Sequence, residues 1–200
     1  MKLPGIREDE GFRIYERVVK FQGKVVGVSV DHIRLPSGHV THHEVIHLPS
    51  AVTIVPLLEE EGRRPEVVLV EQFRNSVEGY IHELPAGVLE RGEDPALCAA
   101  RELKEETGYS SSRITHLSTL LPIPGTSGHL MHFFLAEGLA PGEPCLEESE
   151  CLVVKRFLLE DLVALILGKG RERHPGVAIV DAKTHIGILQ VAMLKGVGPG

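Results

Sequence analysis

One segment, from Asp94 to Gly108, constrains the fold of this chain more than any other. Asp94 is a residue type favoured at a helix N-cap, and Pro95 suits the first helical position. Residues 96–107 are mostly strong helix formers, and Gly108 supplies a stop after them. The segment therefore predicts a helix with a defined beginning and end.

This expected helix has two different faces. At about 100° of rotation per residue, Glu102, Glu105 and Glu106 lie on one face. The adjoining face is mostly apolar and is formed by Ala96, Ala99, Ala100, Leu103 and Thr107. We therefore expect the helix to pack against a sheet while it holds three carboxylates at the edge of a cleft.

Three like charges on one helix face repel each other, and a bound divalent cation would relieve that repulsion. Carboxylate oxygens are hard ligands that suit Mg²⁺ or Mn²⁺. Arg101 can pair with Glu93 or Glu105 and hold the carboxylates in place, while Gly87 and Gly92 allow loop conformations that bring backbone carbonyls near a metal. The alternative is a solvated acidic helix face without a ligand.

Around this helix the sequence alternates between β-branched runs and turn signals, followed by two late helices. A turn is expected at Gln22-Gly23 and another at Pro36-Ser37-Gly38. The expected strands are Arg13–Val19, Lys24–Val30, Val40–Leu48, Ala51–Leu58, Glu66–Phe73, Ile114–Leu120, Met131–Ala136 and Cys151–Phe157. The late helices are expected at Leu159–Leu167 and Ala182–Lys195. This order favours a mixed α+β fold over repeated βαβ units.

The domain organisation is expected to have two parts. Residues 1–49 are expected to form a β-rich segment with a small antiparallel sheet, and residues 50–200 the larger domain that contains the acidic helix. A small sheet of this kind is marginal alone, so we expect it to pack on a second subunit and form a homodimer.

The net charge of −7 argues against a general nucleic-acid or membrane-surface binder, because a polyanion would be repelled. The longest apolar stretch, Leu162 to Leu167, is too short to span a bilayer, and no signal core follows the N-terminus. Cys98, Cys145 and Cys151 have no paired or metal-ligand spacing, which favours reduced thiols and a cytoplasmic protein.

The helix and the loop before it together resemble the Nudix box. Gly87 is followed after five residues by Glu93 and after seven more by Arg-Glu-Leu-Lys-Glu-Glu-Thr-Gly, from Arg101 to Gly108. Only Tyr109, where an aliphatic residue is usual, departs from the pattern. The resemblance implies a Nudix-type α/β/α sandwich with a mixed sheet and metal-assisted hydrolysis of a nucleoside diphosphate derivative.

Features outside the box resemble the ADP-ribose pyrophosphatase branch of that family. They are His43-Glu44-Val45-Ile46, Glu71-Gln72-Phe73-Arg74, Glu83-Leu84-Pro85-Ala86-Gly87, Pro124 sixteen residues beyond Gly108, and Asp181-Ala182-Lys183-Thr184. This resemblance implies Mg²⁺-dependent cleavage of ADP-ribose to AMP and ribose 5-phosphate.

The resemblance also implies roles for individual residues. The metal ligands would be Glu102, Glu106, the Ala86 carbonyl and Glu105. Arg74 would bind the diphosphate and Glu44 would approach the adenine or ribose, with Glu83 and Pro124 also on the substrate side. The base that activates water is left open between Glu105 and a late acidic loop, whose candidates are Glu148 and Glu150, with Glu147 beside them. Aligned on the strand that follows this loop, the position where the branch often has a further glutamate is Val153.

Three alternatives remain. GDP-mannose or another nucleoside diphosphate sugar could be the substrate, and a Nudix-fold sensor could bind its ligand without turnover. The sequence His43-Glu44-Val45-Ile46-His47 spells the zinc-protease motif, but that chemistry needs a helix. On the expected strand, residues four apart are separated by about 13 Å, too far for one zinc ion.

Overall fold

The computed structural model describes residues 11–146 and 151–199. It divides into two compact units, one formed by Met1–Ser50 with Thr119–Met131 and the other by Ala51–Ser118 with His132–Gly200. No helix among the described residues is long and apolar enough to cross a membrane.

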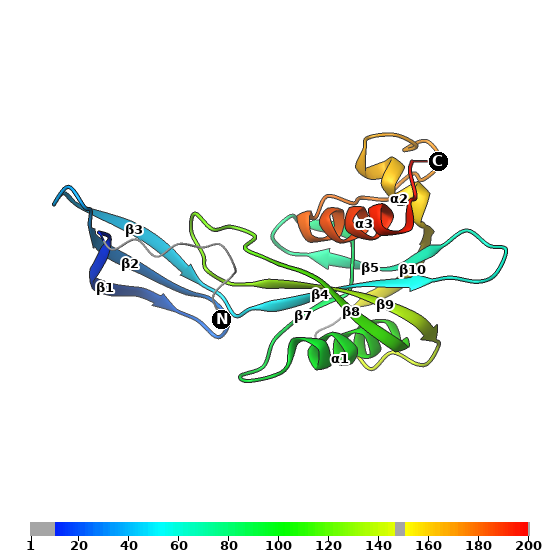
Figure 1. The fold of residues 1–200 in the computed structure, drawn as a ribbon, viewed down its shortest axis with the longest axis horizontal. Helices are drawn as coiled ribbons and strands as arrows, with labels where there is room; N and C mark the ends of the chain where they lie inside the picture. The colour runs from blue at the N-terminus through cyan, green and yellow to red at the C-terminus, as the bar shows by residue number, and fades with distance from the viewer. Residues whose placement is uncertain (1–10, 147–150, 200) are drawn as a thin grey trace. The chain divides into compact units, whose positions relative to one another are not determined.

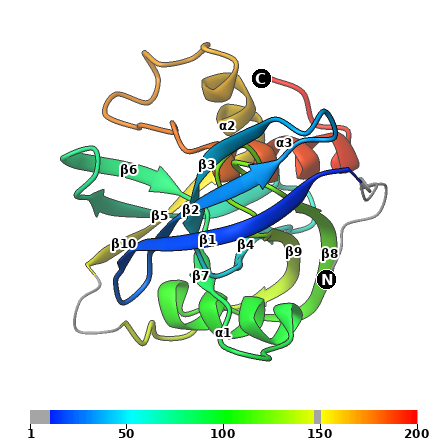
Figure 2. The same ribbon diagram turned by 90° about the vertical axis from the view of Figure 1, so that its left-hand side faces the viewer.

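The first unit contains a three-stranded antiparallel sheet in the order β1-β2-β3. Figure 2 shows these strands side by side. Their bounds are β1 Arg13–Gln22, β2 Gly27–Arg34 and β3 Val40–His47. The first turn was expected at Gln22-Gly23 but lies after Gln22, because β1 continues through that residue. The N–H of Gly23 donates to the Val26 carbonyl at 2.8 Å and closes the turn. The strand expected from Lys24 therefore begins at Gly27.

The His-Glu-x-x-His sequence lies on β3 and not on a helix. His43 pairs with Asp31 of β2, and His47 pairs with Gly27. The Nε2 atom of His47 lies 2.8 Å from the Ser29 hydroxyl, so this ring has a structural partner. The strand geometry argues against the zinc-protease alternative, as the β-branched residues predicted.

The second unit is built on a seven-stranded sheet. The main path runs in the order β10-β5-β4-β9-β8, with β6 paired to β5 and β7 paired to β4. The bounds are β4 Ala51–Leu58, β5 Glu66–Arg74, β6 Gly79–Glu83, β7 Ala86–Val88, β8 Ser110–Leu120, β9 Met131–Ala140 and β10 Leu152–Leu158. Two of these strands, β6 and β7, were not expected from the sequence.

Helices cover both faces of this sheet (Figure 1). They are α1 Pro95–Thr107, α2 Leu159–Ile166 and α3 Ala182–Lys195. Side chains alternate along the central strand: Val55 and Leu57 belong to the core under α2 and α3, whereas Val52 and Ile54 belong to the core under α1. Because a strand buried on both faces has no polar side, β4 reads as an almost continuous apolar run.

The architecture confirms the α+β prediction, with helices on both faces of one sheet and a small antiparallel sheet beside it in the sequence. The late helices begin and end within a residue of their predicted limits. Asp181 caps α3 by accepting the N–H of Thr184 at 3.0 Å, and Gly196 ends the helix with φ of 65°. The prediction that residues 1–49 form a separate dimerisation element stays a prediction.

Candidate active site

Helix α1 has the limits and caps that the sequence predicted. The side chain of Asp94 accepts the N–H of Ala96 at 2.8 Å and that of Leu97 at 3.3 Å. Gly108 ends the helix in the left-handed conformation, with φ of 77°. Cys98, Ala99 and Leu103 are fully buried against the sheet. The packing of these small and apolar groups fixes the rotation of the helix about its axis.

This rotation places the carboxylate of Glu102 directly against Gly87 of β7. A Cβ atom at Gly87 would overlap all three atoms of the Glu102 carboxyl group, which lie well inside 3.0 Å of where it would be. Gly87 pairs with Val52 in the sheet, so its backbone cannot move aside freely. The glycine is therefore needed for close approach, since its φ is not positive, whereas Gly92 in the following turn has φ of 83°.

Glu106 lies one turn further along α1 and also reaches β7. Its carboxylate accepts the N–H of Ala86 at 3.0 Å, and only 7% of the residue is exposed. Glu102 and Glu106 thus lie against consecutive residues of the same short strand. The structure brings together three of the residues expected to hold a metal: Ala86, Glu102 and Glu106.

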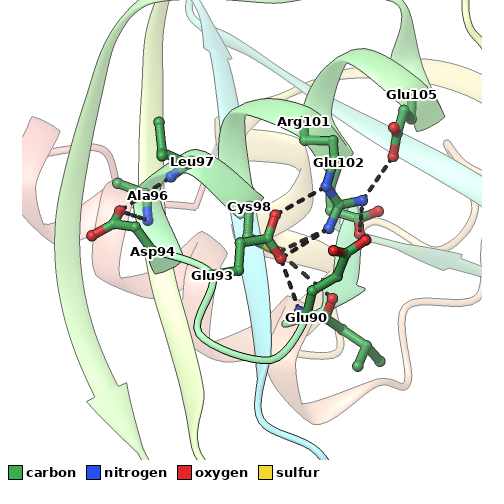
Figure 3. A network of polar contacts seen from close by, with 10 residues as sticks. Glu90, Glu93, Asp94, Ala96, Leu97, Cys98, Arg101, Glu102 and Glu105 are labelled. Atoms are coloured by element: carbon green, nitrogen blue, oxygen red, sulfur yellow. Dashed lines mark hydrogen bonds and ion pairs between the residues drawn. The ribbon is translucent and has the colours of Figure 1, made fainter.

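Arg101 binds three carboxylates around α1, those of Glu93, Glu102 and Glu105, as Figure 3 shows. One guanidinium nitrogen, Nη1, donates to Glu102 at 2.8 Å and to Glu105 at 2.9 Å. The Nε and Nη2 atoms donate to the two oxygens of Glu93 at 3.1 and 3.2 Å. The predicted pairing of Arg101 with Glu93 or Glu105 is present with both, and Arg101 orders the acidic face as a unit.

The same contacts shift the ionisation of the groups around Arg101. Hydrogen bonds from Arg101, and then from the backbone N–H of Glu90, lower the pKa of Glu93 to about 2. The hydrogen bonds to Glu93 raise the pKa of Arg101 above its ordinary value. Burial raises the pKa of the Cys98 thiol to about 12, so this cysteine stays protonated beside the acidic face.

The donor set fits a hard divalent cation. The groups at the β7 edge of α1 are carboxylate oxygens, and the Gly87 backbone leaves open the space that Glu102 occupies. Within residues 11–146 and 151–199, no three His, Cys, Asp or Glu side chains already converge as a ligand set. Glu102 and Glu105 both accept from the same Nη1 atom of Arg101.

A second polar cluster lies at the end of β6. Arg74, at the end of β5, donates from Nε to Glu83 at 3.0 Å and also contacts it through Nη2. Lys183 of α3 lies 3.5 Å from the same carboxylate oxygen. The hydroxyl of Thr184 accepts the N–H of Leu84 at 2.9 Å. Two predicted substrate residues, Arg74 and Glu83, thus contact each other. Glu83 lies three residues before Ala86 in the chain.

The other predicted residues lie elsewhere. Glu44, on β3, is exposed and lines a hollow of about 340 Å³ with His42, His43, Gly125 and Thr126. Pro124 is exposed and directly precedes Gly125 of this lining in the chain. Glu44 and Pro124 both belong to the first unit. Glu147, Glu148 and Glu150 lie outside the described residues.

The sequence did not assign roles to Lys183 and Thr184, which the fold brings to Glu83 and Leu84. Their partners lie about one hundred residues earlier in the chain, so no local spacing could reveal the contacts. The only available signal was the segment Asp181-Ala182-Lys183-Thr184, which resembles the start of the last helix in the ADP-ribose pyrophosphatase branch.

Comparison with known proteins finds a matching family model, similar sequences and a similar solved structure. A family model described as the NUDIX domain matches residues 47–177. An ADP-ribose pyrophosphatase of Bacillus subtilis (strain 168) is 37% identical over 177 residues, which cover 88% of this chain and 89% of the relative. A methanol dehydrogenase activator of Bacillus methanolicus is 35% identical over 84% of this chain and 85% of its own. A crystal structure of an ADP compounds hydrolase has the same fold, with a TM-score of 0.77 and 22% identity over 96% of this chain and 98% of that one.

Proposed function

This chain belongs to the Nudix family, and from that premise we propose that it hydrolyses ADP-ribose to AMP and ribose 5-phosphate with the help of a divalent cation. The observation that carries the proposal is the acidic face of α1, where Glu102 lies against Gly87 and accepts a hydrogen bond from Arg101. The choice of ADP-ribose is supported by the relative of that activity, which shares 37% of its residues over most of both chains.

We propose Mg²⁺ as the cation, with Mn²⁺ as a substitute, held by the Ala86 carbonyl, Glu102, Glu105 and Glu106. The hard oxygen chemistry of this set supports the proposal. Bound there, the cation would offset the charge of the diphosphate and lower the pKa of the attacking water.

The protein's own residues would bind and orient the substrate. Arg74 offers a half-exposed guanidinium for the diphosphate, and Glu83 fixes its direction. Glu44 and Pro124 are proposed to contact the adenosine part. Oxygen of water would attack one phosphorus while the bond from that phosphorus to the bridging oxygen breaks. The proton of the water would pass to a carboxylate, for which we propose Glu105 on α1 or Glu148 and Glu150 after it.

We further propose that the protein is a cytoplasmic homodimer in which residues 1–49 provide the subunit contact. The support for the dimer is the set of large exposed apolar side chains on and just before β1. These are Phe12, Ile14, Tyr15, Val19 and Phe21, each at least half exposed. A three-stranded sheet with such a surface gains stability when another surface covers it.

The test is a panel of nucleoside diphosphate derivatives assayed with Mg²⁺, comparing kcat/KM for ADP-ribose, GDP-mannose and other sugar nucleotides. We expect release of AMP from ADP-ribose to be fastest and to stop when the cation is chelated. A strong preference for GDP-mannose would replace the substrate and keep the chemistry. Tight binding of ADP-ribose without turnover would show a sensor and refute the enzymatic proposal.

A further inference from the structure

Glu83 is a buried carboxylate with two cations on one of its oxygens. Only 4% of the residue is exposed. The Oε2 atom accepts from Arg74 Nε at 3.0 Å, and Lys183 Nζ lies 3.5 Å from that same atom. A buried charge without a partner would be strongly unfavourable, and Arg74 and Lys183 supply the compensating positive charges beside Glu83.

Lys183 also contacts a second carboxylate. Its Nζ atom donates to Asp181 at 2.8 Å, and the lysine side chain is only 13% exposed. Asp181, Lys183, Glu83 and Arg74 therefore form a row of alternating charges. The row starts at the N-cap of α3 and ends at Arg74, whose side chain is the most exposed of the four.

The start of the row is firmly anchored. Asp181 accepts both the N–H and the hydroxyl of Thr184, at 3.0 and 2.7 Å, and Thr184 is fully buried. The same hydroxyl accepts the N–H of Leu84, the residue after Glu83. The first turn of α3 is thus fastened both to the backbone after Glu83 and, through Lys183, to its carboxylate.

Removing Lys183 would have a specific consequence for Arg74. The two carboxylates of Asp181 and Glu83 would lose the cation between them, and Arg74 would then compensate the charge of Glu83 without Lys183. Arg74 would then be held more strongly by Glu83 and become less available to an external anion.

We propose that Lys183 is a positioning residue for diphosphate binding, which acts through Glu83 to hold Arg74 available to the substrate. This inference rests on the proposed function, because it takes Arg74 as the group that binds the diphosphate. Lys183 itself is separated from the exposed end of the row by Glu83, so it does not touch the substrate.

The test compares K183M with K183R by calorimetric binding of inorganic pyrophosphate in Mg²⁺ and by steady-state kinetics. We expect K183M to raise the Kd of pyrophosphate and the KM of the substrate about tenfold, the change expected when one charge-assisted hydrogen bond is weakened. The kcat should change less than about threefold, because uniform binding is lost and not the chemistry. K183R keeps the charge and should restore both constants.

Lys195 provides the matched control, since it lies on the same helix and also pairs with two carboxylates, Glu59 at 2.9 Å and Glu137 at 3.0 Å. K195M should lower Tm and leave Kd and KM unchanged. If K183M lowers Tm as K195M does and leaves Kd unchanged, Lys183 has a structural role only and the proposal is wrong.

A double variant tests the route through Arg74. In the R74M background K183M should have no further effect on Kd, because coupled residues are not additive. An equal effect of K183M in both backgrounds would overturn the proposal, and so would an unchanged Kd in R74M itself. Pyrophosphate binding requires no turnover, so a failure of the ADP-ribose assay alone is read separately from a failure of this inference.

Discussion

Replacing Gly87 by alanine should inactivate this protein far more than it destabilises it. The added Cβ would overlap the carboxyl carbon and both oxygens of Glu102. Because β7 is paired to β4 through Gly87 and Val52, the backbone is held and the carboxylate must yield. To reach an ordinary contact of at least 3.4 Å it must withdraw by about 1 Å or more.

The size of both effects follows from that displacement. A misplacement of about 1 Å in a group that positions the reacting atoms lowers the rate about 100-fold, so we expect kcat/KM for ADP-ribose to fall by at least that factor. Overpacking costs about 1–3 kcal/mol, which for a protein of this size lowers Tm by about 2–12 °C. The variant should therefore remain folded at room temperature.

The assay is AMP release under saturating Mg²⁺, with Tm measured on the same samples. Gly128→Ala is the control, because a Cβ there meets nothing within 4 Å and its φ is not positive. It should behave like the wild type. If Gly87→Ala keeps kcat/KM within about threefold, the position of the Glu102 carboxylate does not control catalysis and the reasoning fails.

Three further predictions address stability and assembly. The lowered pKa of Glu93 means that its ionised form stabilises the fold above the ordinary value of 4.5 and that this contribution is lost as the pH falls toward about 2. In denaturant unfolding, the free energy of unfolding should accordingly fall less between pH 4.5 and about pH 2 in E93Q than in the wild type. An equal dependence on pH in the two proteins would contradict the effect of Arg101 on Glu93. T184V should remove the acceptor for the buried Leu84 N–H and lower the free energy of unfolding by about 1–3 kcal/mol, whereas T184S should keep it; equal stability of the two variants in thermal melts would be evidence against this contact. The double variant V19K/F21K should convert the proposed dimer to a monomer in light scattering, and a variant that is still dimeric would show that β1 does not form the subunit contact.

Local signals in the sequence predicted most of the secondary structure. The helix from Pro95 to Thr107 needed only its cap, its proline and its terminal glycine, all of which act within one turn. The strand Ala51–Leu58 was found with its observed limits, because its apolar run is bounded by turn residues. By contrast, β6 and β7 are short and carry glycine, so their pairing partners determine them more than their own residues do.

The site could be predicted only where its spacing is local. The contacts of Arg101 with Glu93 and Glu105 follow from the turn of the helix and the loop before it. The reason for Gly87 is different: the sequence suggested freedom of the loop, whereas the fold shows that Glu102 occupies the space of a side chain. The contact of Lys183 with Glu83 depends on how α3 packs on the sheet, which no spacing along the chain encodes.

The close approach of Glu102 to Gly87 also determines where the chain can change in length. One residue inserted into α1 between Ala99 and Arg101 would turn everything after it by about 100° and advance it by about 1.5 Å, while Cys98 and Ala99 stay buried. Glu102 would then point away from β7, and Arg101 away from Glu93. The connection from Glu59 to Pro65 between β4 and β5 has no such constraint, since it is largely exposed. We therefore expect insertions to be tolerated in the connection between β4 and β5. A change of length within α1 should abolish activity, even where every amino acid of the motif is retained.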